Sequence, residues 1–193
     1  YALAWLLEHQ ANNVGMAIFY DPQVVKLALT AGVGSQLTIR LGGKLGPTSG
    51  DPLDFTVTVT AIQRNYRHRF PQIDLETGKE SDPTYLPIGD VVALHCQGID
   101  ILVNSKRAQC FSPCIFSDLG VNPNHKSLLI VKSAQHFYGA FAPIAGEVIY
   151  MAAPGAVPPI MQQIPYQRMR TDNKYPWVED PFATKKINPM EKV

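Results

Sequence analysis

Three chemically active side chains follow one apolar run in the second half of the chain. The run 128–131 is apolar and partly β-branched, and Lys132, Ser133 and His136 come directly after it. An ammonium, a hydroxyl and an imidazole within five residues suit a carboxylate or another anion. The run predicts a strand, and we expect a helix to begin after it with Ser133 as its N-cap. A capped core helix beside a lysine that reaches for solvent explains the same residues without a ligand.

A second group of suitable residues lies in the glycine-rich stretch 41–53. Gly42 and Gly43 allow close backbone approach, and Lys44 adds a cation just after the alternating pattern of 36–41. The phosphate-loop motif GxxxxGK[ST] is absent, and the stretch leads into another strand rather than a helix. It therefore predicts either a wall of the same site or a plain hairpin connection.

Ser105 and Arg107 follow a third predicted strand, 99–104. A guanidinium group can hold a carboxylate in a bidentate pair, although a solvated turn would also contain these residues. Because all three stretches leave the ends of predicted strands, we expect Lys132, Ser133 and His136 to converge with Gly43, Lys44 and Arg107 on one concave surface. That surface would be the substrate-binding site.

Neither a metal site nor a nucleophile is predicted on this chain. HExxH and GxSxG are both absent. The cysteines are odd in number and lack paired CxxC spacing, which favours buried free thiols in a reducing compartment. The candidate metal ligands are scattered without ligand spacing: His9, His68, His95, His125, His136, Cys96, Cys110 and Cys114.

The elements that must position these residues alternate between strands and helices. Asp21 and Pro22 open an amphipathic helix that ends before Gly32, and the first residues of the chain are also helix-forming. The stretch 112–119 is weakly helical, and 76–89 is polar and turn-rich. Strands are expected at 14–20, 36–41, 54–62 (continuing through the basic run 64–69), 91–96, 99–104, 126–131 and 147–151. The pattern predicts an α/β fold with a mixed sheet, packed helices and β-hairpins.

Composition sets broad limits. A chain of 193 residues with 46% hydrophobic residues predicts one globular domain. A net charge of +1, with no run of 18 apolar residues, argues against nucleic-acid and membrane binding and favours a cytoplasmic protein. We expect this domain to span 1–155 and an extended, proline-rich arm packed on it to span 156–193, because seven prolines fall within 36 residues: Pro154, Pro158, Pro159, Pro165, Pro176, Pro181 and Pro189.

Several of these stretches carry a family resemblance. In order, DPQVVKLALTAGVGS, LGGKLGPTSGDPL, VNSKRAQCF, LLIVKSAQHFYGAFAPIA and the APG at 153–155 resemble the C-terminal domain of the MlrC family, over roughly residues 14–170. These are microcystin-degradation proteins, classed as metal-dependent peptidases. The resemblance implies a larger N-terminal catalytic domain, absent from this chain, that carries the zinc ligands. It also implies that this chain alone is inactive.

Two hypotheses follow from the resemblance. In the first, this domain faces a peptide-like small substrate in a metallopeptidase-type hydrolase, where Lys132, Ser133, His136, Lys44 and Arg107 orient a carboxylate or stabilise an oxyanion. His136 is then the candidate catalytic residue. In the second, the domain is non-catalytic and serves interdomain packing or oligomerisation, which leaves a homo-oligomer open.

Overall fold

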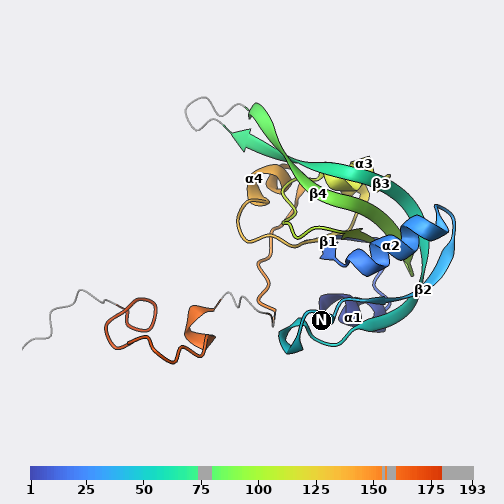
Figure 1. The fold of residues 1–193 in the computed structure, drawn as a ribbon. Coiled ribbons are helices and arrows are strands. Elements are labelled where there is room, and N and C mark those ends of the chain that lie inside the picture. The colour runs from blue at the N-terminus through green and yellow to red at the C-terminus, as the bar shows by residue number, and fades with distance from the viewer. Residues whose placement is uncertain (74–79, 154, 156–159, 180–193) are drawn as a thin grey trace, which may run out of the picture. The chain divides into compact units, whose positions relative to one another are not determined.

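A mixed β-sheet forms the centre of this computed structural model (Figure 1). The structure describes residues 1–73, 80–153, 155 and 160–179. Within these residues the strand order is β2-β3-β4-β5-β1-β6, with β1 parallel to both of its neighbours and the remaining pairs antiparallel. The bounds are β1 Val14–Tyr20, β2 Gln36–Leu41, β3 Leu53–Ile73, β4 Glu80–Cys96, β5 Ile99–Asn104 and β6 Leu128–Val131. The predicted α/β class with a mixed sheet is confirmed.

Four α-helices accompany the sheet in the described part of the chain. They are α1 Ala2–Glu8, α2 Pro22–Ala31, α3 Cys114–Asp118 and α4 Tyr138–Phe141, with 3-10 turns at Pro47–Ser49, Pro123–His125, Ala142–Ile144 and Met161–Gln163. The α2 helix begins as predicted, because the Asp21 carboxylate accepts a hydrogen bond from the Val24 amide at 3.2 Å and Pro22 occupies the first turn. It ends at Gly32, whose φ of 87° suits glycine. None of the helices in this part of the chain is long and apolar enough to cross a membrane.

Two hydrophobic clusters cover the two faces of the sheet. The first joins α1 and α2 to β2 and to one face of the central strands, and α2 contacts β4 and β5. The second joins α3 and α4 to the opposite face. The alternation of β5 divides its side chains between them, since Ile99, Ile101 and Val103 lie in the first cluster and Leu102 in the second. The central strands are therefore buried on both sides.

The end of β2 lies near the start of α2, and the long strand β3 follows β2 in the chain. Its first six residues pair with β2, and the rest pairs with β4. Leu41, the last residue of β2, is buried in the same cluster as Val24 and Val25 of α2. The glycine-rich stretch after Leu41 therefore begins beside the carboxyl end of β1, where α2 also begins.

The predicted turn-rich excursion at 76–89 is wrong for its described part. Residues 80–89 belong to β4 and pair with β3, with Thr84 opposite Phe70 and Leu86 opposite His68, while 76–79 lie outside the described residues. Several register shifts interrupt this ladder. Before Val91, β4 has no partner in β5 among the described residues, so Pro83 and Pro87 lie on a free edge, where a missing N–H is tolerated.

Two further predictions near the C-terminal part of the sheet are wrong. No helix begins at Ser133; α4 begins at Tyr138, and Phe137 occupies its N-cap position. The stretch 147–151 is not a strand, because it pairs with no described strand and the Ile149 side chain is 76% exposed. The hairpin of 91–96 and 99–104 is confirmed, with Gln97 and Gly98 at positive φ in its turn.

The chain divides into two compact units, Tyr1–Tyr150 and Met151–Val193. Both hydrophobic clusters belong to the first unit. In the described part of the second unit, the Tyr166 and Trp177 rings meet edge to face at 5.6 Å between centroids. The arm's packing on the domain stays a prediction.

Candidate functional site

The carboxyl ends of β5, β1 and β6 share one edge of the sheet. The three strands are parallel, with Tyr20 opposite Asn104 and Ala17 opposite Val131. The residues that follow these strands therefore emerge at the same edge. This arrangement brings two of the predicted stretches together, the one containing Arg107 and the one containing Lys132.

Arg107 and Lys132 form a pair of cations at this edge. The Arg107 guanidinium lies over the Tyr20 ring, 5.1 Å from its centroid. Partial burial lowers the pKa of Lys132, and the positive charge of Arg107 lowers it further. Among the described residues, neither side chain makes an ion pair with a carboxylate. Two positive charges thus act on one another at this edge, and no counter-ion for them lies among the described residues.

The loop after β5 fixes the position of Lys132 and Ser133. The Cys110 amide donates to the Lys132 carbonyl at 2.9 Å, and the Lys132 ammonium donates to the Ala108 carbonyl at 3.2 Å. The Ser133 hydroxyl donates to Oε1 of Gln109 at 3.0 Å. Ser133 therefore joins two loops instead of capping a helix. Gln109 was not predicted as a site residue, although it lies in the stretch VNSKRAQCF that carries the family resemblance; its partners Ser133 and Ala134 are more than 20 residues away.

His136 lies against an aromatic wall. Its exposed ring meets Phe70 at 5.6 Å and Phe111 at 6.0 Å, edge to face in both cases. The buried His68 ring also stacks on the Phe111 ring. Its Nε2 accepts a hydrogen bond from the Phe111 amide at 2.8 Å. Burial lowers the pKa of His68 to about 4, so the ring is neutral. Its Nδ1 is buried without a partner among the described residues.

The glycine-rich stretch binds a carboxylate of its own chain. The Gly42 amide and the Lys44 ammonium both donate to Oδ2 of Asp21, at 3.2 and 2.7 Å, and Asp21 is 2% exposed. Gly43 has a φ of +63°, and a Cβ there would lie 2.2 Å from the Pro52 nitrogen, so this glycine lets two parts of the loop cross. Substrate binding by Gly42, Gly43 and Lys44 stays a prediction.

Asn104 connects Asp21, at the end of β1, with the loop that contains Arg107. Its backbone carbonyl accepts from the Asp21 amide at 3.1 Å, and its side-chain amide donates to the Lys106 carbonyl. The side chain is fully buried, and Oδ1 has no partner among the described residues. Ser105 is also engaged, because its hydroxyl accepts from the Asp90 amide at 2.8 Å. Asn104 was missed, although a polar residue at the end of an apolar strand was the available signal.

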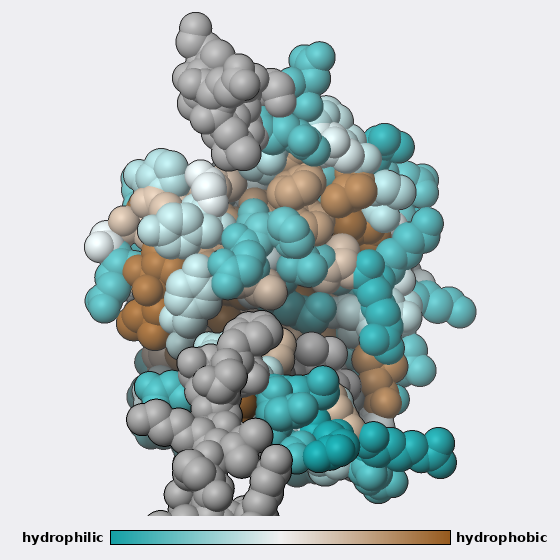
Figure 2. All heavy atoms as spheres, turned by 90° about the vertical axis from the view of Figure 1, so that its left-hand side faces the viewer, coloured by the Kyte–Doolittle hydropathy of each residue, from teal (hydrophilic) through white to brown (hydrophobic). Residues whose placement is uncertain are grey.

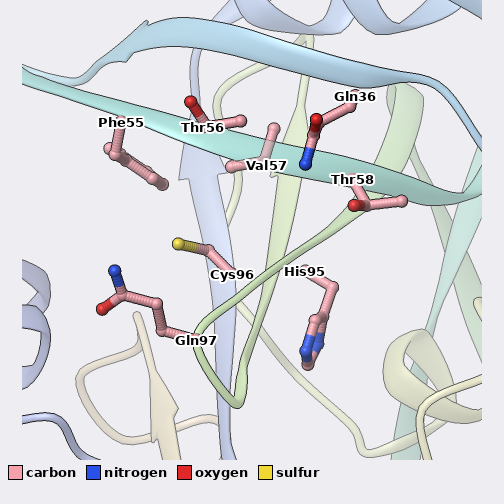
Figure 3. Close-up of a pocket in the computed structure, with 8 residues that line it drawn as sticks. All are labelled: Gln36, Phe55, Thr56, Val57, Thr58, His95, Cys96 and Gln97. Carbon is pink, nitrogen blue, oxygen red and sulfur yellow. The ribbon is translucent and has the colours of Figure 1, made fainter.

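A separate open pocket of about 450 Å³ contains none of the predicted site residues (Figure 3). Figure 3 shows its side chains between β3 and the β4–β5 hairpin. Its lining consists of Gln36, Phe55, Thr56, Val57, Thr58, His95, Cys96 and Gln97. Cys96, Cys110 and Cys114 are free thiols. The described residues contain no group of three or more His, Cys, Asp or Glu side chains that could hold a metal ion.

On the face drawn in Figure 2, the molecular surface is neither uniformly hydrophobic nor uniformly hydrophilic. Among the coloured residues, hydrophobic patches are separated by hydrophilic side chains.

Comparisons with known proteins agree on one family. Residues 1–168 match the family model described as "MlrC C-terminus". Microcystinase C from Sphingomonas sp. is 35% identical over 134 residues, which cover 69% of this chain and 24% of that protein. The fold is similar to the crystal structure of a protein described as "Putative metallopeptidase" from Mesorhizobium sp. BNC1, with a TM-score of 0.67 and 24% identity, over 88% of this chain and 33% of that one. The chain thus spans about a quarter to a third of the length of these relatives.

Proposed function

Because the chain belongs to the MlrC C-terminal domain family, we propose that it is the substrate-facing domain of a metal-dependent peptide or amide hydrolase. The observation that carries this proposal is the pair of cations at the carboxyl edge of the sheet. Arg107 and Lys132 follow neighbouring parallel strands at this edge, the charge of Arg107 lowers the pKa of Lys132, and neither makes an ion pair with a carboxylate among the described residues. An anion from outside this domain would relieve their mutual repulsion.

A substrate carboxylate fits this pair best. The planar guanidinium of Arg107 would bind both carboxylate oxygens, while the Lys132 ammonium would add a point charge from the neighbouring strand. Ser133 holds the backbone beside Lys132, and the exposed ring of His136 would line the next part of the same surface. In this role His136 would donate a hydrogen bond to the substrate or to a developing oxyanion.

The zinc implied by the family does not fit the described residues of this chain, which offer no ligand group. We therefore propose that its ligands belong to an N-terminal catalytic domain, which would be the main partner of this domain, and we assign no step of the reaction to a metal on this chain. A peptide-like small substrate would be bound between them, without nucleic acid or membrane, in a cytoplasmic enzyme. A homo-oligomer remains compatible with this proposal.

Binding of a short peptide with a free carboxylate tests the proposal. The probe is N-acetyl-Ala-Ala, compared with its C-terminal amide, titrated into the chain and followed by NMR. We expect the carboxylate form to bind more tightly, and Arg107→Gln or Lys132→Gln to weaken its binding about 10-fold or more, as loss of a charge-assisted hydrogen bond does. Lys26→Gln is the matched control, because Lys26 is an exposed lysine on α2 and is not one of the candidate site residues. Equal binding of acid and amide would contradict the proposal.

The intact hydrolase offers the second measurement. There Lys132→Gln and His136→Ala should lower kcat/KM by about 10- to 1000-fold at unchanged metal content.

One observation favours a non-catalytic structural role instead. Lys132, Ser133, Lys44 and Ser105 all make hydrogen bonds within the chain. A domain that only supports packing would respond to the same substitutions with a lower melting temperature and nearly normal turnover in the folded fraction. Melting temperature and kcat/KM, measured on the same variants, separate the two roles.

A further inference from the structure

We propose that Asp21 is a positioning residue for Arg107, and that Gly42 and Lys44 act on the substrate only through Asp21. This inference rests on the carboxylate site proposed above. It differs from the sequence-based expectation that Lys44 itself binds the substrate. Asp21, Gly42 and Lys44 together are called the Asp21 clamp below.

The hydrogen bonds that the structure shows for the clamp side chains all meet on the Asp21 carboxylate. Oδ1 of Asp21 accepts from the Val24 amide, while Oδ2 accepts from the Gly42 amide and the Lys44 ammonium. An amide and an ammonium that meet on one oxygen form an anion cradle, and the chain's own carboxylate fills it. Because Asp21 is 2% exposed, removing its cation would leave a buried charge, so we expect Lys44 to keep its bond to Asp21 instead of leaving it for a substrate.

The clamp lies directly next to Tyr20, the residue on which Arg107 rests. Asp21 follows Tyr20 directly, and its amide donates to the Asn104 carbonyl at 3.1 Å. Tyr20 itself pairs with Asn104 in the sheet, so the backbone on both sides of the Tyr20 ring is fixed. The guanidinium of Arg107 lies over that ring.

Preorganisation gives this arrangement a functional consequence. An arginine side chain loses much conformational entropy when it binds a ligand, and a guanidinium already held against an aromatic face loses less. The Tyr20 ring therefore holds the Arg107 guanidinium in a position to bind a carboxylate, and the Asp21 clamp restrains the position of the ring. Breaking the clamp should weaken binding without removing any group that touches the ligand.

Five variants of the chain test this inference with the same N-acetyl-Ala-Ala probe. Asp21→Asn keeps an N-cap for α2 but removes the charge that holds Lys44. We expect it to weaken binding about 3- to 5-fold, and Asp21→Asn/Lys44→Met to weaken it by the same factor, because the two residues act as one unit. The double variant also carries no unpaired buried charge, so it remains informative if Lys44→Met alone unfolds. Tyr20→Leu should match Asp21→Asn, whereas Tyr20→Phe, which keeps the ring, should bind as the unchanged chain does.

The NMR shifts of the Arg107 side chain report its position without any ligand. A guanidinium held over an aromatic ring has upfield-shifted protons, and these shifts should shrink in Asp21→Asn and Tyr20→Leu but not in Tyr20→Phe. Unchanged shifts and unchanged affinity in Asp21→Asn would overturn the inference. So would a further loss of 3-fold or more when Lys44→Met is added to Asp21→Asn, because Lys44 would then bind the probe directly. Failure of the proposed function is a different result: the unchanged chain would bind the acid and the amide equally, and the Arg107 shifts would still decide the role of the clamp.

Discussion

His68 lies wholly inside the protein, where burial lowers the pKa of its imidazole from 6.5 to about 4 against a weaker opposing effect of Asp118. An unfolded chain therefore binds a proton at His68 that the folded chain takes up only near pH 4. The resulting stability is fully present above pH 6.5 and is lost as the pH falls toward 4, at up to about 1.4 kcal/mol per pH unit. Urea unfolding of the unchanged chain should show this slope.

Two substitutions isolate the contribution of His68. His68→Gln keeps a side-chain acceptor for the Phe111 amide but does not titrate, so the free energy of unfolding should be less dependent on pH between 6.5 and 4. His125→Gln, at an exposed histidine, should keep the slope of the unchanged chain. Parallel curves for the unchanged chain and His68→Gln would show that His68 is not the group responsible.

A residue of the candidate site could be predicted from the sequence only where its neighbours in sequence determine its position. Arg107 and Lys132 were predicted because each follows the end of a predicted strand, and the structure shows that these strands end at one edge because both are parallel to β1. The partners that hold them were not predicted as site residues. Tyr20, Gln109 and Asn104 act across long separations in sequence. Asp21 was predicted only as the cap of α2, where its partner Val24 is three residues away, whereas Lys44 is 23 residues away.

The glycine-rich loop after β2 provides a matched pair of substitutions at the scale of one element. Gly42 and Gly43 both have positive φ, but a Cβ at Gly42 meets nothing within 4 Å, whereas one at Gly43 would lie 2.2 Å from the Pro52 nitrogen. Gly42→Ala should therefore cost only the left-handed backbone penalty of about 1–2 kcal/mol. Gly43→Ala should cost clearly more, and thermal unfolding of the two variants measures the difference. Equal melting temperatures would show that the loop moves away from Pro52 at no cost.

Elements with a strong local signal were predicted well, and those defined by distant partners were not. The α2 helix has its cap, its apolar face and its terminal glycine within one stretch, β1 is a continuous apolar run, and β5 is apolar apart from Asp100 and its last residue, Asn104. By contrast, residues 80–89 are strand because β3 pairs with them, despite their proline and glycine content. The expected helix at Ser133 failed for a similar reason, since the Ser133 hydroxyl bonds to Gln109 of another loop.

At the scale of the whole molecule, the first unit contains both hydrophobic clusters and every candidate site residue. A chain of residues 1–150 should therefore unfold cooperatively, with a melting temperature within about 5 °C of the full chain, which corresponds to roughly 1–2 kcal/mol. It should also keep its affinity for N-acetyl-Ala-Ala. A loss of more than about 10 °C would instead indicate that the proline-rich arm stabilises the domain by packing on it.

The two-sided burial of β5 raises the question of what sets its alignment with β4 and β1. Both faces of this strand meet aliphatic clusters, so a slip by one residue would exchange one apolar set for another at little hydrophobic cost. The polar residues make the difference. Asp100 pairs with His95 and Lys126 at the start of the strand, and Asn104 is fixed at its end. A slip would turn this carboxylate and this amide into the first cluster without partners, so these two side chains select one register among otherwise similar alternatives.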